Sequence, residues 1–201
     1  MIGIKYRIKR QESEKDFNKS KFFGAPFFPE GLVETLDEDD VFICQINLED
    51  IEHFNCDLPK RGYLYFFINV SSYQYEGKVF YVDDTSSIKN DFVVIDDIND
   101  DFLDDYQIPS PMYMEFYRIN NDSQKEFSWE DFDIQLFGEC PDFIEEEYRL
   151  EGYRCLLMID TMGVDIFPSF GSLDGYILFM IKEEDLINQN FNNILLITWD
   201  S

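Results

Sequence analysis

The most regular feature of the chain is a set of short, nearly unbroken apolar runs that recur at a fixed spacing. The run GYLYFFI, from Gly62, returns as GYILFMI at Gly175, 113 positions later. The same offset of 113 takes FICQINL, from Phe42, to CLLMIDT, from Cys155. Short runs that are rich in Phe, Tyr and Ile are typical of β-strands, and their lack of alternation indicates strands covered on both faces.

Two weaker pairs extend this correspondence. KVFYV, from Lys78, matches NILLIT, from Asn193, and FFGAP around Gly24 matches LFGECP around Gly138. Helix signals are few and brief, and they comprise NLEDIEHF, IKEEDLINQNF, SEKDFNKS and PDFIEEEYRL. We therefore expect an α+β fold that is strand-rich, in which two related tandem halves, about 20–95 and 134–201, pack as one compact domain over residues 1–201.

The composition is that of a folded protein with a large negative charge. The chain is 45% hydrophobic and 17% aromatic, well above the apolar content of disordered acidic proteins. Its net charge is −26, and because residues 1–21 carry a local charge of +4, the remainder carries −30. Such a surface repels nucleic acid and anionic lipid and attracts basic proteins. The alternative is that the negative charge only keeps this aromatic-rich protein soluble and attracts no specific partner.

An acidic connection over 83–105 joins the two predicted halves. It holds nine acidic residues against Lys89, and VVIDDI within it still predicts a strand. We expect its exposed loops to contact a basic partner through Asp96, Asp97, Asp100, Asp101, Asp104 and Asp105. An EF-hand loop needs a glycine at a fixed place between its oxygen ligands, and this glycine is missing here and in LDEDDVF. We therefore predict no dedicated metal site.

Catalytic signatures are few. His53 is the single histidine, and its spacing to Cys56 supports neither a nucleophilic pair nor a zinc knuckle. The sequence also lacks a phosphate-binding GxxxxGK[ST] loop, GxGxxG, GxSxG and HExxH. We therefore predict no cofactor and assign no catalytic residue. The four cysteines do not form a disulfide framework, and no apolar run approaches the roughly 20 residues that cross a bilayer, so we expect a cytoplasmic protein with reduced thiols.

Polar residues interrupt the apolar runs near their ends. Gln45 and Asn47 lie near the end of one predicted strand, and Asp160 is equivalent to Asn47 by the offset of 113. Asn and Asp commonly cap the next turn by accepting hydrogen bonds from backbone amides. The alternative is that the two strand ends meet and line a shared cleft, which predicts a ligand site made of Gln45, Asn47 and Asp160.

The ordered motifs SKFFGAPFFP, CQINLEDI, LPKRGYLYFFI and DGYILFMIKEEDLINQNFNNILLITWDS together resemble the YwqG-like family, a bacterial domain of unknown function, over nearly the whole chain. The resemblance implies a compact α+β domain and no established reaction. Members occur near polymorphic toxin systems, which implies an immunity or other protein-binding role. The chain departs from the pattern at Ile134 and Gln135, where relatives carry His-Lys, and at Met158, where relatives carry Gln.

Charge, missing signatures and resemblance lead to one functional hypothesis and one rival. The hypothesis is an acidic protein-binding module, of immunity type, that neutralises a basic toxin. The rival is a small-molecule or metal-dependent enzyme with its site between the two halves. A pocket ringed by Gln45, Asn47 and Asp160 favours the rival, whereas satisfied strand caps and an acidic face favour binding.

Overall fold

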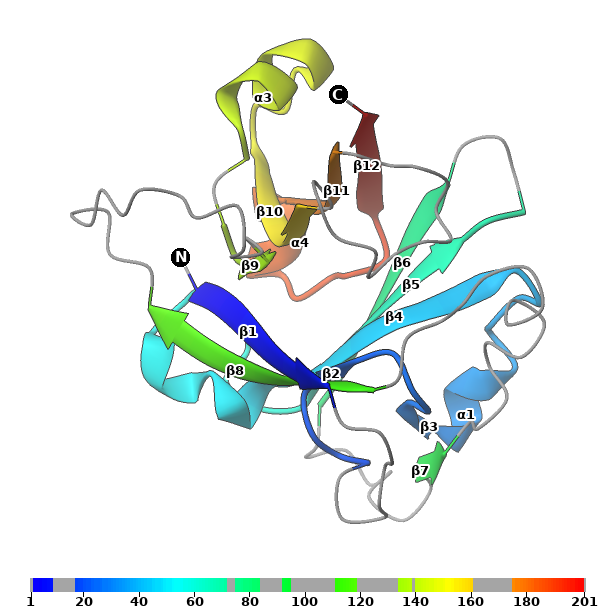
Figure 1. Cartoon of the computed structure of the whole chain (residues 1–201). Helices are drawn as coiled ribbons and strands as arrows, with labels where there is room; N and C mark the ends of the chain where they lie inside the picture. Colours follow the sequence, from blue (N-terminus) through cyan, green and yellow to red (C-terminus); the bar gives the residue numbers. More distant parts are fainter. Residues whose placement is uncertain are drawn as a thin grey trace.

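The computed structural model describes residues 2–8, 17–71, 75–83, 92–94, 111–118, 134–138, 140–160 and 175–200. Its main feature is a ten-stranded antiparallel sheet in the order β12-β11-β10-β9-β1-β8-β2-β4-β5-β6 (Figure 1). Its strands are β1 (Ile2–Ile8), β2 (Lys21–Phe22), β4 (Asp40–Asn47), β5 (Tyr63–Asn69), β6 (Glu76–Val82), β8 (Met112–Arg118), β9 (Ile134–Leu136), β10 (Tyr153–Asp160), β11 (Gly175–Lys182) and β12 (Ile194–Asp200). A separate pair consists of β3 (Phe27–Pro29) and β7 (Phe92–Val94).

The large sheet curves until its two edge strands meet. β6 and β12 contact each other, although within the described ranges no hydrogen-bonded ladder joins them. At Gly77 of β6 the approach leaves little room for a side chain, because an added Cβ would lie 3.1 Å from the Cβ of Leu196 and 3.2 Å from the ring of Phe179. The fold is therefore an incompletely closed antiparallel barrel, and a glycine lies at its seam.

The main hydrophobic core fills the inside of this barrel. Alternate residues of β5 point inward, so Leu64 and Phe66 join the core, while Tyr65 and Phe67 belong to a second cluster on the outer face with Phe28 of β3. The short helix α1 (Glu30–Val33) and β3 cover this outer cluster. Every residue of β5 is buried as a result. The expectation that this apolar run is covered on both faces is confirmed.

A third cluster lies on the outer face of β10, β11 and β12, beneath α3 (Asp142–Tyr148). Ile144 of α3 is fully buried there against strand residues such as Cys155 and Leu178. In Figure 1, α3 lies at one end of the molecule, and α1 with the β3–β7 pair lies at the other. The remaining short helices are η2 (Leu48–Asp50), η3 (Glu52–Phe54) and α4 (Glu183–Ile187). No helix of the described residues is long and apolar enough to cross a membrane.

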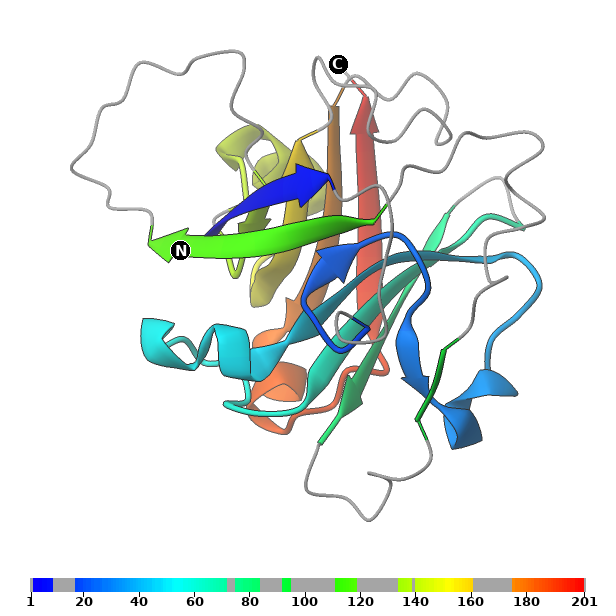
Figure 2. The ribbon, with the colours of Figure 1, turned by 60° about the horizontal axis from the view of Figure 1, so that its bottom comes forward.

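The expectation of an α+β fold made of two tandem halves is wrong. The longest described helix has seven residues, so the described helices cover patches of the sheet and form no layer of their own. Moreover, β1 and β8 come from outside both predicted halves, and they lie between β9 and β2 in one continuous sheet (Figure 2). The acidic segments that follow the strands supply only one or two helical turns, too few for a stable helical layer.

The offset of 113 residues seen in the sequence nevertheless relates positions with similar local backbone geometry. A β-bulge lies between Phe42 and Cys44 in β4, and another lies between Cys155 and Leu157 in β10, 113 positions later. The residues that follow β2 and β9 both adopt a left-handed backbone, with φ of 51° and 54°. These similarities concern strands within one sheet, and they do not divide it into two packed units.

Candidate functional site

Gln45 of β4 is fully buried, and its side-chain amide forms hydrogen bonds with the backbone of a neighbouring segment. Its Nε2 donates to the carbonyl oxygens of Phe17 at 2.6 Å and Lys19 at 2.8 Å. Its Oε1 accepts from the backbone amide of Phe27 at 2.8 Å. Both donors of the amide and one acceptor position are therefore engaged within the protein.

The cross-strand neighbour of Gln45 is Lys21, which is also fully buried. Its Nζ donates to the carbonyl oxygen of Ala25 at 2.6 Å and lies 5.6 Å from the centroid of the Phe17 ring. A buried ammonium group needs such partners, because removal from water disfavours its charge. Lys21 and Gln45 together hold residues 17–27 against β4, and we call this pair the clasp.

Asn47 and Asp160, the other two predicted ligand residues, lie apart in the sheet. The Oδ1 of Asn47 accepts from the amide of Glu49 at 3.1 Å and caps η2, as the capping alternative predicts. Asp160 ends β10, is partly buried and has partners of its own within the structure. Four strands separate β4 from β10, which corresponds to about 24 Å along the curved sheet. The fold does not place Asn47 and Asp160 at neighbouring strand ends.

The other sequence candidates are His53 and the cysteines. His53 is exposed and lies against Phe54, with ring centroids 4.0 Å apart and ring planes tilted by 39°. Burial raises the pKa of the Cys44 and Cys155 thiols, and burial with nearby Glu145 and Asp142 raises the pKa of Cys140 to about 11. These three thiols are protonated at neutral pH and are weak nucleophiles. The described residues contain no cluster of three metal-ligating side chains. The six aspartates predicted to contact a partner, 96 to 105, lie outside the described residues.

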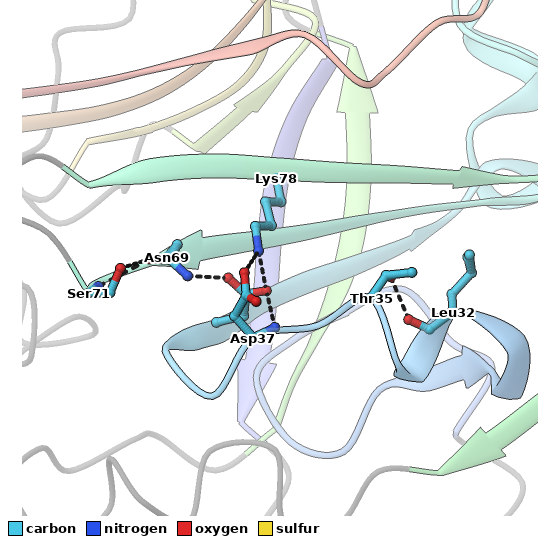
Figure 3. A network of polar contacts seen from close by, with 7 residues as sticks. Leu32, Thr35, Asp37, Asn69, Ser71 and Lys78 are labelled. Carbon is cyan, nitrogen blue, oxygen red and sulfur yellow. Dashed lines mark hydrogen bonds and ion pairs between the residues drawn. The ribbon is translucent and has the colours of Figure 1, made fainter.

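A network of polar contacts at the start of β4 serves the fold (Figure 3). The carboxylate of Asp40, which is 1% exposed, accepts from Lys78 Nζ at 2.6 Å and from Asn69 Nδ2 at 2.8 Å. It also accepts from the backbone amide of Asp37. Burial lowers the pKa of Lys78, but its hydrogen bonds to Asp37 and Asp40, together with their charges, outweigh burial and raise it. The network joins β4, β5 and β6.

The sequence did not predict the most distinctive surface, which lies where α3 meets the edge of the sheet. Phe143 of α3, Tyr176 of β11 and Trp199 of β12 form an aromatic cluster, in which the ring centroids of Phe143 and Trp199 are 4.8 Å apart. The Tyr176 centroid lies 6.1 Å from each of the other two. Phe143 is 47% exposed. The Nε1 of Trp199 donates to Glu147 Oε2 at 3.3 Å.

Acidic side chains flank this cluster. Residues 142–151 contain five acidic residues against Arg149. A shallow, open depression on α3 is lined by Asp142, Glu145, Glu146, Arg149, Leu150 and Glu151. We call the aromatic cluster and this depression together the α3 surface. Its chemistry suits binding, because it offers apolar rings and carboxylates and no activated nucleophile.

One sequence signal could have indicated the α3 surface. Phe143 and Glu147 are four residues apart, so a helix places them on one side. Tyr176 and Trp199, in contrast, are neighbours because they are direct partners in the β11–β12 ladder. Spacing along the sequence does not reveal this pairing.

Comparison with known families gives one match. The sequence model of a family described as a domain of unknown function, DUF1963, matches residues 20–200. No curated protein matches the chain. The expectation of a domain of unknown function is confirmed, whereas the narrower YwqG-like assignment stays a prediction.

Proposed function

The chain belongs to the DUF1963 family, and from this premise we propose that it is an acidic protein-binding module whose partner is a basic protein. The observation that carries the proposal is the α3 surface, where the exposed Phe143 of the aromatic cluster belongs to a helix rich in carboxylates. Clusters of exposed aromatic side chains are typical of protein interfaces, because their burial against a partner supplies much of the binding energy.

The charge of the chain supports a basic partner. A net charge of −26 attracts basic proteins over about 8 Å at physiological salt and accelerates their encounter. As a specific form of this proposal, the partner is a toxin that the module neutralises, in keeping with the resemblance to YwqG-like proteins. We expect the module to act in the cytoplasm, as a single domain.

The described residues give less support to the rival enzyme. Gln45 donates and accepts within the clasp, and the side chain of Asn47 caps η2. Both side chains thus form hydrogen bonds that stabilise the fold. We therefore base the proposal on the α3 surface.

The test compares three forms of the full chain as immobilised bait in an extract of the native host. The first is the wild type. The second carries Glu145→Gln, Glu146→Gln and Glu151→Gln in the depression. The third carries Glu30→Gln, Glu34→Gln and Glu38→Gln, which makes the same charge change on exposed residues near α1, at the other end of the molecule.

We call the second form the α3 variant and the third form the α1 variant. We expect mass spectrometry to identify a basic protein that the wild type and the α1 variant retain and the α3 variant loses. Its association rate with the wild type should fall steeply as salt rises. Equal retention by all three forms, or an association rate that does not change with salt, would overturn the proposal. If the partner is a toxin, co-expression of the wild type should restore growth and co-expression of the α3 variant should not.

A further inference from the structure

The three rings of the aromatic cluster come from three elements and are tilted against one another. The planes of Phe143 and Trp199 make an angle of 56°, and those of Tyr176 and Trp199 make 44°. Phe143, with 47% of its surface exposed, meets solvent on the helix, while Tyr176 and Trp199 are partly buried beneath it. A cation that approaches Phe143 therefore meets a ring held in place by two others.

A carboxylate lies beside these rings. Glu147 is exposed, four residues after Phe143, and its Oε2 accepts the indole hydrogen bond of Trp199 at 3.3 Å. This hydrogen bond holds the carboxylate next to the cluster. Within the described part of the chain, Glu147 forms no ion pair with a basic side chain. The site thus presents a carboxylate and aromatic rings side by side.

We propose that the α3 surface recognises an arginine side chain of its partner, which stacks on Phe143 and pairs with Glu147. This inference rests on the proposed function and names the residue type that the surface selects. A guanidinium group is planar and weakly hydrated, so it stacks on aromatic rings while it donates two hydrogen bonds to a carboxylate. A lysine ammonium group is compact and strongly hydrated, and it gains less from the rings.

The experiment uses two labelled peptides, hexa-arginine and hexa-lysine, which have equal length and charge. Fluorescence anisotropy measures their dissociation constants with the full chain at physiological salt. We expect hexa-arginine to bind the wild type about twofold to fivefold more tightly than hexa-lysine, as a cation–π contact at an exposed site allows. Phe143→Leu retains an apolar side chain and removes the ring, so it should abolish this preference and weaken hexa-lysine much less than hexa-arginine.

Matched variants separate the arginine contact from general charge attraction. Glu147→Gln should weaken hexa-arginine more than hexa-lysine, whereas Ile187→Ala, at a side chain 80% exposed on α4, should change neither. Thermal melting by circular dichroism checks that each variant folds. Equal affinities for the two peptides in the wild type, or a preference that survives Phe143→Leu, would overturn the arginine inference.

The peptide data also distinguish failure of the inference from failure of the proposed function. Equal affinities that both fall in the Glu145/Glu146/Glu151→Gln variant leave a charge-selective α3 surface and overturn only the arginine contact. If the affinities for both peptides fall as much in the Glu30/Glu34/Glu38→Gln variant as in the Glu145/Glu146/Glu151→Gln variant, the peptides respond to net charge alone. That result overturns both the arginine contact and the proposed function.

Discussion

Replacement of Gln45 by Met removes the polar atoms of the clasp at nearly constant side-chain volume. Three hydrogen bonds are lost, those to the carbonyl oxygens of Phe17 and Lys19 and that from the amide of Phe27. All three hydrogen bonds are partly buried, although Lys19 itself is exposed, and each loss leaves a backbone group without its partner. Met is also the residue that occupies the position 113 further along the chain, at Met158 in β10.

The expected loss follows from these three contacts. A hydrogen bond contributes about 1 kcal/mol net, and a buried group left unpaired costs at least as much, so Gln45→Met should lower the free energy of unfolding by about 3 kcal/mol. For a chain of this length, a change of that size lowers Tm by about 6 to 12 °C. Loss of a residue that only binds a ligand would leave Tm of the free protein unchanged or raise it.

Urea unfolding followed by circular dichroism measures the change. A lower midpoint at an unchanged slope reports stability alone. Gln135→Met is the matched control, because the Oε1 of Gln135 in β9 is buried and has no hydrogen-bond partner among the described residues, so its removal should cost less than about 1 kcal/mol or stabilise. Equal midpoints for the two variants, or a Gln45→Met variant as stable as the wild type, would refute the structural role of the clasp.

Three further predictions concern the cap, the seam and the network. Asn47→Ala should cost about 1 kcal/mol in urea unfolding and Asn47→Asp much less, because Asp retains the capping oxygen; equal losses would contradict a capping role. Gly77→Ala should destabilise by about 1 to 3 kcal/mol through crowding at the seam, whereas Gly31→Ala, with open space around the added Cβ, should not. The raised pKa of Lys78 means that its pairing with Asp40 stabilises fully below its unfolded pKa of 10.5 and is lost as pH rises through the folded value. The difference in unfolding free energy between wild type and Lys78→Met should therefore stay constant from pH 8 to about pH 10 and shrink as pH rises above 10.5, and a difference that stays constant above pH 10.5 would contradict the assignment.

The sequence allowed the buried strands to be predicted but not the way in which they combine. The runs at β4, β5, β10 and β11 are apolar because both of their faces are covered, and that cause leaves a local signal. β1 leaves a weaker signal, since IGIKYRI mixes apolar residues with Lys and Arg. Its place between β8 and β9 depends on partners more than 100 residues away, which no local pattern specifies.

The candidate site shows the same division. The capping role of Asn47 follows from its residue type and its place before η2, and the sequence offered it as one of two alternatives. The contact between Phe143 and Trp199 depends on how α3 packs over β11 and β12, which spacing along the chain does not reveal. Net charge indicated a basic partner but did not say which face would meet it.

The position of β1 determines when the middle of the sheet can form during translation. The first strand of the chain pairs with β8 on one side and β9 on the other, so the middle of the sheet cannot form until residue 136 has left the ribosome. Translation of that interval takes roughly 6 to 26 s at about 5 to 20 residues per second. For that time the strands that cover the inner apolar faces of β4, β5 and β6 are still missing, and β10, β11 and β12 must follow before the sheet is complete.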